Sequence, residues 1–186
     1  MPAGGSVQEP DPRTVEAARR GDLAAFEEIV RASQADVWRF VFHLARDEGI
    51  ADDITQDAFI KAFRHIKRYR GDSRFSTWLF SIARNCAMDE FRRSGRRRKL
   101  EAEMEFQPHA PEFDQTRSYD IREALKALSL DVREPLVMID LFGLTYRDVS
   151  DVLGVPVGTV KSRVHRARML LAKMFAENER EETGEF

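Results

Sequence analysis

Residues 141–168 read LFGLTYRDVSDVLGVPVGTVKSRVHRAR, a stretch that predicts two short helices joined by a tight turn. Thr145 and Asp148 have the spacing of a capping box, in which both side chains satisfy amide groups at a helix start. Gly154 can adopt the left-handed conformation that ends a helix, and Pro156 suits the beginning of the next one. We therefore expect a helix-turn-helix whose turn has about three or four residues.

The second helix of this pair combines one apolar face with an entirely basic charge. Its apolar residues recur at steps of three and four, as a buried stripe requires, at Val157, Val160, Val164, Ala167 and Leu171. Its charged residues are Lys161, Arg163, Arg166, Arg168 and Lys173. An ordinary solvated face usually mixes both signs, so this bias favours a polyanionic partner, and the DNA major groove admits such a helix.

Composition places the chain among soluble, helix-rich proteins. Its 186 residues, 42% of them hydrophobic and 33% charged, can form one large or two small domains. No strand pattern persists, so we expect an all-α fold. No apolar run approaches the length of a membrane span, and the first residues lack the apolar core of a signal peptide. We expect a cytoplasmic protein with no membrane span.

The net charge of −2 hides a strong segregation of charge along the chain. Residues 84–99 are mainly basic, whereas residues 100–120 and 177–186 are mainly acidic. Solvated surface and charged tails are one interpretation of this pattern. Two separate contacts with nucleic acid are the other, and the segregation favours it.

The N-terminal half shows several amphipathic helices after a flexible leader at residues 1–12. Asp22 is expected to cap one helix, Asp36 to open another, and residues 52–66 to form a further one. The outer side of this last helix carries Asp53, Gln56 and Asp57. From the residues alone, capping of the helix start is the favoured role for these acids, ahead of a binding face.

A loop at residues 67–76 interleaves cations with aromatic rings. Proteins that bind single strands use such a mixture to neutralise the backbone and to stack bases. A helix follows to about Arg93, with Ser73 or Ser76 as its expected cap. Its outer face is expected to carry Ser81, Arg84, Asn85, Met88 and Arg92. Duplex or single-stranded DNA is the natural counterpart of that face.

Periodicity fails between about residues 94 and 117, where Pro108 and Pro111 accompany acidic residues. So long a structureless stretch is unusual inside a compact domain, and we place a domain boundary there. Two helices then precede the helix-turn-helix, and Asp131 is expected to cap the second of them. The predicted organisation is a domain at residues 13–95, a flexible acidic linker at 96–118, a second domain at 119–177, and flexible tails at 1–12 and 178–186.

No catalytic or metal-binding pattern emerges from the sequence. The histidines are far apart without ligand-like spacing, at His43, His65, His109 and His165. Cys86 is the single cysteine and is expected in the core. Neither a glycine-rich phosphate loop nor a nucleophile elbow occurs. We therefore expect a binding protein and not an enzyme, with no cofactor and no metal.

Two stretches resemble the conserved regions of bacterial sigma-70-type RNA polymerase initiation factors, in the extracytoplasmic-function (ECF) group. They are residues 52–93, DDITQDAFIKAFRHIKRYRGDSRFSTWLFSIARNCAMDEFRR, and residues 144–171, LTYRDVSDVLGVPVGTVKSRVHRARMLL. The first matches the domain for the promoter −10 element, and the second matches the domain for the −35 element. Both motifs occur in order at this spacing, which makes the match specific, and with the linker it covers about residues 13–176.

The resemblance implies a transcription initiation factor that binds core RNA polymerase and directs it to promoter DNA. Docking on the β′ clamp helices is implied for Asp53, Gln56 and Asp57, which replaces the capping interpretation. Base capture and recognition of the −10 element are implied for Tyr69, Arg74, Phe75, Trp78, Ser81, Arg84, Asn85 and Arg92. Recognition of the −35 element is implied for Thr159, Lys161, Ser162, His165 and Arg166, with phosphate contacts from Arg163 and Arg168. The β flap and an anti-sigma factor are further implied partners.

Two alternatives stay open from the sequence. A stand-alone helix-turn-helix regulator would bind its operator tightly without polymerase, usually as a dimer. A DNA-processing enzyme such as a recombinase would need a catalytic Ser, Tyr or metal-carboxylate cluster, which this sequence does not assemble. For an initiation factor we expect weak DNA binding by the free chain, because the net charge is negative and a loose linker gives the two domains little pre-organisation.

Overall fold

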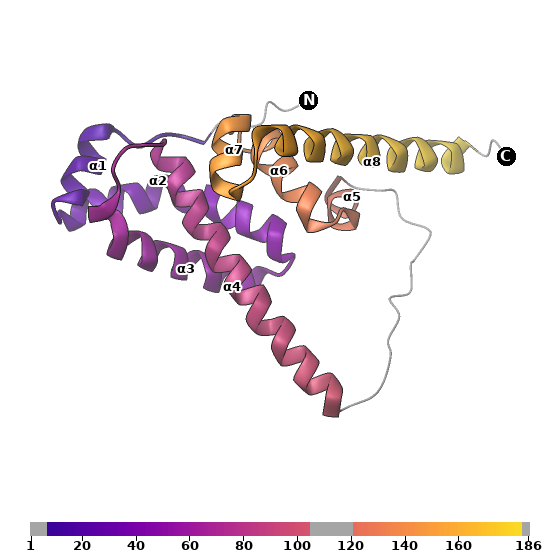
Figure 1. The fold of residues 1–186 in the computed structure, drawn as a ribbon, viewed down its shortest axis with the longest axis horizontal. Helices are drawn as coiled ribbons and strands as arrows, with labels where there is room; N and C mark the ends of the chain where they lie inside the picture. Colours follow the sequence, from indigo (N-terminus) through magenta and orange to yellow (C-terminus); the bar gives the residue numbers. More distant parts are fainter. Residues whose placement is uncertain (1–6, 105–120, 184–186) are drawn as a thin grey trace.

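The structure, a computed structural model, describes the backbone of residues 7–104 and 121–183. It describes side chains for residues 7–95, 121 and 124–176. All secondary structure in these ranges is helical, which confirms the expected all-α fold. The helices are α1 (Pro12–Arg19), α2 (Leu23–Ala45), α3 (Glu48–His65), the 3₁₀ turn η1 (Ile66–Arg68), α4 (Phe75–Met104), α5 (Ile121–Ala127), α6 (Leu130–Asp140), α7 (Tyr146–Leu153) and α8 (Val157–Thr183) (Figure 1). Within the described ranges, no helix combines the length and apolar character needed to cross a membrane.

Helices α1 to α4, which we call the N-terminal bundle, start largely on aspartates. Asp11, Asp22 and Asp47 each accept a hydrogen bond from a backbone amide in the first turn of α1, α2 and α3. These carboxylates satisfy amide groups that have no partner inside the helix. The cap predicted at Asp22 is confirmed.

α2 runs unbroken through Asp36, so the prediction that a separate helix opens there is wrong. Residues 31–36 contain neither glycine nor proline, and the helical hydrogen bonds therefore continue across them. The Asp36 carboxylate pairs instead with Arg39 one turn later. Further along α2, the buried ring of Phe40 lies 4.9 Å from that of Phe80 and joins α2 to α4 in the core.

α4 begins at Phe75 and continues to Met104, past the domain edge expected at residue 95. Neither predicted cap is found, because Ser73 donates to a neighbouring carbonyl and Ser76 lies inside the helix. The carboxylate of Glu9 instead accepts hydrogen bonds from the amide and the hydroxyl of Ser76. A residue assigned to the flexible leader thus completes the start of α4. The remainder of the expected linker, residues 105–120, lies outside the described residues.

Helices α5 to α8 form the C-terminal bundle, which contains the predicted helix-turn-helix. Asp148 Oδ2 accepts from the Thr145 amide at 3.0 Å, and the Asp148 amide donates to the Thr145 hydroxyl at 3.1 Å, so the capping box is confirmed. Gly154 ends α7 in the left-handed conformation, with φ at 65°. α8 then starts at Val157 after a turn of the predicted length.

The start of α6 differs from the prediction. Ser129 occupies the N-cap position, so the cap predicted at Asp131 is wrong. Asp131 lies in the first turn, where its carboxylate accepts a hydrogen bond from the Ser129 hydroxyl at 2.6 Å. This bond, above all, holds the pKa of Asp131 below its usual value. A first-turn acid is favourable there because the helix dipole is positive at that end.

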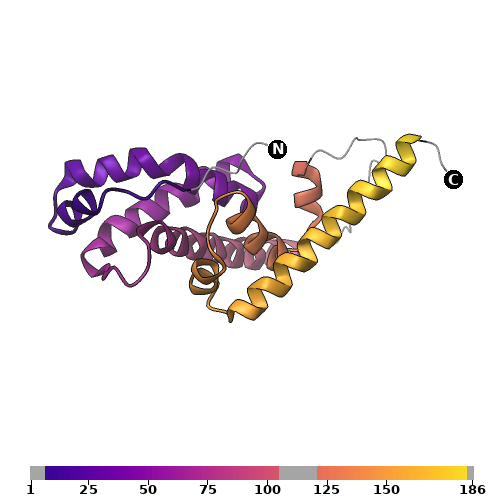
Figure 2. The ribbon, with the colours of Figure 1, turned by 90° about the horizontal axis from the view of Figure 1, so that it is seen from above.

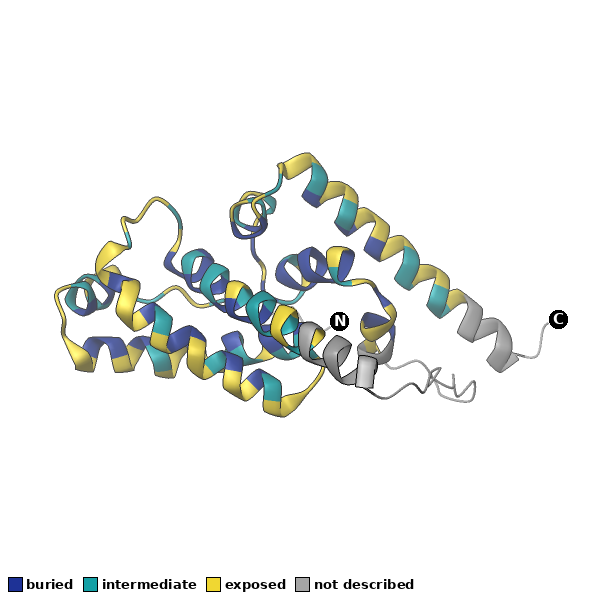
Figure 3. Ribbon diagram, turned by 60° about the horizontal axis from the view of Figure 1, so that its bottom comes forward, coloured by how far each residue is buried: buried dark blue, intermediate teal, exposed yellow. Residues whose placement is uncertain are grey.

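The two bundles pack against each other, with α2 and α4 on one side and α6 and α7 on the other (Figures 1 and 2). Phe142, between α6 and α7, is 3% exposed, and its ring lies 5.3 Å from Phe80 and 6.0 Å from Phe40. The backbone amide of Val7 donates to the Phe142 carbonyl at 3.1 Å. Exposed residues alternate with buried and intermediate ones along the described part of α8, so one side of this helix stays exposed (Figure 3). The sequence did not predict this packing of one bundle against the other.

Candidate protein and nucleic-acid interfaces

Asp53, Gln56 and Asp57 are exposed together on the outer face of α3. α3 begins at Glu48 and is capped by Asp47, so Asp53 lies beyond the first turn. The capping role that the residues alone favoured is therefore wrong for these acids, because the dipole effect is confined to the first turn. They are available to a partner.

The ridge formed by these three side chains separates two recesses. Gln56 borders a groove of about 430 Å³ between α2 and α3, which Trp38 also lines. Asp53 and Asp57 border a smaller hollow of about 120 Å³ beside Lys61. A ridge that carries two acids and an amide between recesses suits a protein surface with basic and apolar groups.

Three aromatic rings organise the loop between η1 and α4. Tyr69 lies 5.4 Å from Phe75 and 5.3 Å from Trp78, measured between ring centroids, and Phe75 lies 5.3 Å from Trp78. The Tyr69 hydroxyl donates to the Ser73 carbonyl at 2.6 Å and holds the loop closed. Burial in this cluster, chiefly, raises the pKa of the Tyr69 hydroxyl. Phe75 is only 3% exposed, so its ring supports the loop from inside, whereas Tyr69 and Trp78 are half-buried.

A cavity of about 280 Å³ lies between this loop and α1. Its lining combines carboxylates, guanidinium groups and aromatic rings, contributed by Glu9, Glu16, Arg19, Tyr69, Arg70, Arg74 and Phe75. Arg70 and Arg74 are exposed at the loop surface. A flat polar ring with an attached phosphate matches this mixture, because aromatic faces stack bases and arginines pair with phosphates.

The outer face of α4 carries polar side chains in different situations. Asn85 and Arg92 are exposed, and Arg92 lies 3.5 Å from Asp89 on the same helix. The hydroxyl of Ser81 donates to the Trp78 carbonyl one turn earlier, at 2.6 Å. Arg84 is half-buried, because it faces the C-terminal bundle.

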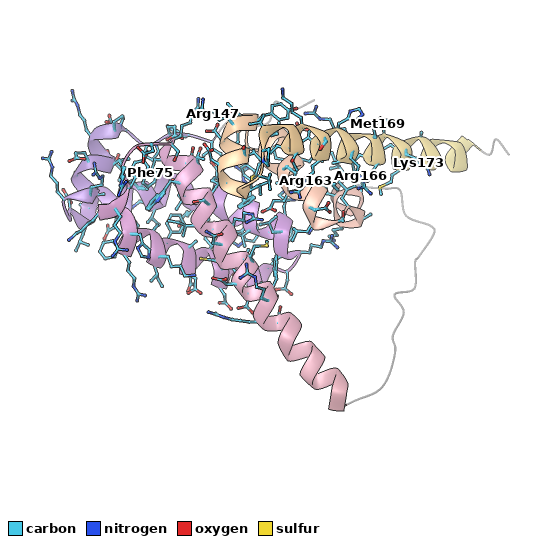
Figure 4. The ribbon with its side chains drawn as sticks, viewed as in Figure 1. Phe75, Arg147, Arg163, Arg166, Met169 and Lys173 are labelled. Atoms are coloured by element: carbon cyan, nitrogen blue, oxygen red, sulfur yellow. The ribbon has the colours of Figure 1, made fainter. Side chains whose placement is uncertain are left out.

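α8 presents the basic surface expected of the second helix in a helix-turn-helix. Its exposed polar residues include Lys161, Ser162, His165 and Arg166. Thr159 and Arg163 are half-buried, and Thr159 accepts a hydrogen bond on its carbonyl from the Ser162 hydroxyl at 2.9 Å. Arg163, Arg166 and Lys173 follow one another along the helix (Figure 4). The predicted buried stripe is present at Val160, Val164 and Ala167, whereas Val157 is 36% exposed at the helix start.

Arg168 differs from the other cations of α8. Its guanidinium donates to both carboxylate oxygens of Asp140, at 2.6 and 3.2 Å. The hydrogen bonds that Arg168 donates to Asp140 are the chief reason that the pKa of Arg168 is raised. This pair ties α8 to the end of α6 and sets the direction of the helix.

Sequence reasoning missed three residues that contact α4 or belong to its start, namely Glu9, Thr77 and Glu134. Glu9 caps α4 from the leader, and Thr77 and Glu134 contact residues of the opposite bundle. No local pattern marks them, because each acts through a partner that is distant in the sequence. Within the described residues, no group of three or more His, Cys, Asp or Glu side chains could hold a metal ion.

Family comparisons match both bundles. The family model described as Sigma-70 region 2 matches residues 29–97, and that described as Sigma-70, region 4 matches residues 118–171. The first region covers most of α2, all of α3, the loop and most of α4, and the second covers α5 to α7 and the first half of α8, which includes the helix-turn-helix.

Individual relatives extend this result. The chain is 39% identical over 157 residues to the ECF RNA polymerase sigma factor SigC of Mycobacterium tuberculosis, with 81% of this chain and 83% of the relative covered. It is 34% identical over 178 residues to the ECF RNA polymerase sigma-E factor of Escherichia coli, with 88% and 93% covered.

Two solved structures are also similar. One is the sigma factor RpoE in complex with the anti-sigma factor NepR from Bartonella quintana, with a TM-score of 0.70, 29% identity, and 83% of this chain and 98% of that chain covered. The other is CnrH in complex with the cytosolic domain of CnrY, with a TM-score of 0.69, 25% identity, and 91% and 99% covered. The chain therefore belongs to the ECF group of the sigma-70 family, the non-enzymatic factors that direct RNA polymerase to promoters.

Proposed function

We propose that the two bundles divide promoter recognition between them. The N-terminal bundle binds the melted −10 element through the loop at residues 69–75 and the outer face of α4. The C-terminal bundle binds the −35 element through α8. The observation that carries this proposal is the aromatic and arginine-lined cavity beside the loop, which has the size and chemistry to hold an unstacked base.

In the −10 interface, the residues have distinct roles. Tyr69 and Trp78 present ring faces for stacking, Phe75 supports them from the core, and Arg74 neutralises the backbone. On α4, the exposed amide of Asn85 pairs with a base edge. Ser81 and Arg92, on either side of Asn85 along the helix, contact DNA phosphates. Arg84 also contacts a phosphate once its contact with the C-terminal bundle is broken.

In the −35 interface, α8 lies in the major groove. Lys161, Ser162, His165 and Arg166 are exposed and contact base edges. Thr159 positions the start of the helix, and Arg163 and Arg168 contact phosphates. The Arg168–Asp140 pair ties α8 to α6, while the Arg168 side chain stays 51% exposed to solvent.

Polymerase contacts complete the proposal. The ridge of Asp53, Gln56 and Asp57 docks on the β′ clamp helices, supported by its exposure and by the two recesses beside it. The C-terminal bundle contacts the β flap. The protein works in the cytoplasm, where its polymerase is found. RpoE was solved in complex with the anti-sigma factor NepR, and CnrH in complex with the cytosolic domain of CnrY. We infer that this chain also binds an anti-sigma factor.

Transcription in vitro with core RNA polymerase on a randomised promoter library tests this proposal. We expect selected promoters to share two elements at a fixed spacing, and Arg74→Ala to lower transcription from all of them. Arg64→Ala, which removes an exposed arginine from α3, is the matched control. Tight binding to one DNA site without core enzyme would favour a stand-alone regulator instead.

A further inference from the structure

The cavity proposed to hold the unstacked base has two walls. The loop at residues 69–75 forms one wall, and α1 forms the other, with Glu16 and Arg19 among its residues. α1 packs against η1, which leads into the loop, so the two walls are held together. Burial is the chief cause that raises the pKa of the Tyr69 hydroxyl, and the nearby positive charge of Arg19 opposes this rise. The proposed −10 contacts come from the loop wall, whereas the α1 wall carries chemistry of its own.

Arg19 has one unused edge on its guanidinium group. Its Nη1 atom donates to Glu16 Oε2 at 2.7 Å. Its Nε atom is buried, and neither Nε nor Nη2 has a hydrogen-bond partner within the residues that the structure describes. A buried donor without a partner is costly, and such an atom in a native protein usually has a functional reason. The cavity beside Arg19 supplies a place for the missing acceptor.

The same edge holds two oxygen atoms in two other arginines of this chain. Arg84 uses Nε and Nη2 to bind both carboxylate oxygens of Glu134, and Arg168 uses them to bind both oxygens of Asp140. The two N–H bonds are parallel, so this edge suits two neighbouring acceptors on one planar group. Arg19 therefore offers the cavity a site for two adjacent acceptor atoms.

A phosphate is a poor occupant of this site. The carboxylates of Glu9 and Glu16 line the same cavity and repel an anion. Arg70 and Arg74 are exposed at the loop surface, where a phosphate keeps its contact with water. A neutral base is not repelled, its amino groups donate to carboxylates, and its flat face suits the aromatic lining. A base is therefore the group that Arg19 contacts.

The four bases differ in whether they carry two adjacent acceptors. Guanine has them at O6 and N7, and cytosine has them at O2 and N3. Adenine has its amino group beside both N1 and N7, and thymine has an N–H group between its two carbonyl oxygens. In adenine and thymine, a donor would therefore face one of the two N–H groups of Arg19. The edge of Arg19 favours guanine or cytosine.

We propose that Arg19 is a specificity-determining residue of the −10 interface, and that the base it reads in the cavity is guanine or cytosine. In this structure the Nε atom is covered, but the side chain as a whole is 36% exposed. A small rotation of the guanidinium group therefore turns the unused edge toward the base. This inference rests on the proposed capture of an unstacked base by the cavity.

Transcription by holoenzyme on the randomised promoter library, followed by sequencing of the selected promoters, tests the inference. The parent protein should select guanine or cytosine over adenine and thymine at one −10 position by roughly tenfold. Arg19→Met, which removes every donor, should lower this preference to less than about twofold at that position only. Arg19→Gln should shift the preference there toward adenine, because an amide presents one donor and one acceptor.

Arg20→Met is the matched control for these variants. Arg20 also pairs with Glu16, at 3.2 Å, but its side chain is 77% exposed and does not line the cavity. This variant should keep the base preferences of the parent at every position. Circular dichroism verifies that the N-terminal bundle stays folded, and Arg19→Gln, which keeps a polar side chain, gives the decisive result if methionine unfolds α1.

Contrary results distinguish this inference from the proposed function. Unchanged base preferences in both Arg19 variants would overturn the reading role of Arg19. A loss that is uniform across all promoters would also overturn it, because Arg19 would then contact a phosphate or act only on the fold. Selection of adenine or thymine at every −10 position by the parent would overturn the base identity. In each of these cases base capture still stands, whereas selected promoters that share no −10 element would refute the capture itself.

Discussion

Glu9 accepts hydrogen bonds from both the backbone amide and the side-chain hydroxyl of Ser76, across 67 positions of sequence. The carboxylate caps α4 beside the aromatic loop and also lines the cavity proposed for the unstacked base. The leader therefore borders the proposed −10 interface. Its nearby Val7 contacts the C-terminal bundle, so the same segment touches both halves of the protein.

Replacement of Glu9 should destabilise the N-terminal bundle. Glu9→Ala removes the acceptor at the start of α4, and loss of a helix cap typically costs about 1 kcal/mol in free energy of unfolding. Urea denaturation followed by circular dichroism measures this change. Glu9→Gln retains an acceptor and should lose less, and Asp151→Ala, at an exposed position, should have no comparable effect. Equal stability of Glu9→Ala and the parent would show that the cap contributes nothing.

Asp148 should make the C-terminal bundle sensitive to acid. Burial alone would raise its pKa, but hydrogen bonds from Thr145 and Thr77 outweigh burial and place the pKa below its usual value. A lowered folded-state pKa contributes stability at pH values above the unfolded pKa, and that contribution is lost as the pH falls through the folded pKa. Below about pH 4 the thermal midpoint should therefore fall, since an aspartate in an unfolded chain titrates near that value.

Asp148→Asn supplies the control for this pH dependence. The amide keeps the shape of the side chain and one acceptor oxygen but does not titrate as a carboxylate. Its thermal midpoint should lie below that of the parent at neutral pH, and the difference should shrink as the pH falls. A difference that stays constant from pH 7 to pH 3 would mean that Asp148 is not the group responsible.

The helix-turn-helix was predictable because its signals are local. Thr145, Asp148 and Gly154 act through neighbours within a few positions, so one short stretch of sequence contains the whole argument. The acidic ridge on α3 was also visible as a pattern, although its role required the family resemblance. The contact between bundles was not predictable, because Arg133 and Glu134 have the composition of an ordinary solvated helix face and their partners are distant in sequence.

Arg166 and Lys173 should have different effects on promoter choice. Arg166 lies at the exposed face proposed to contact bases, and Arg166→Ala should cost about 1–3 kcal/mol of discrimination at one −35 position. Lys173→Ala removes the same charge further along α8 and should weaken all promoters similarly, with a smaller salt dependence of binding. Holoenzyme transcription on a set of single-base −35 variants distinguishes the two patterns. A uniform loss in Arg166→Ala would assign that residue to a phosphate.

The ridge on α3 should control the affinity for core polymerase without affecting folding. The side chains of Asp53, Gln56 and Asp57 are exposed and make no hydrogen bond or ion pair within the described residues. Asp53→Ala with Gln56→Ala should therefore leave the thermal midpoint nearly unchanged. In an anisotropy titration with core enzyme it should weaken binding about tenfold or more, because two charged or polar contacts at the centre of a protein interface together commonly contribute more than 1 kcal/mol. Glu28→Ala on the exposed side of α2 is the matched acidic control and should bind like the parent. If the double variant binds core enzyme as tightly as this control, polymerase docks elsewhere on the N-terminal bundle. The recesses beside Trp38 and Lys61 then do not belong to the polymerase interface.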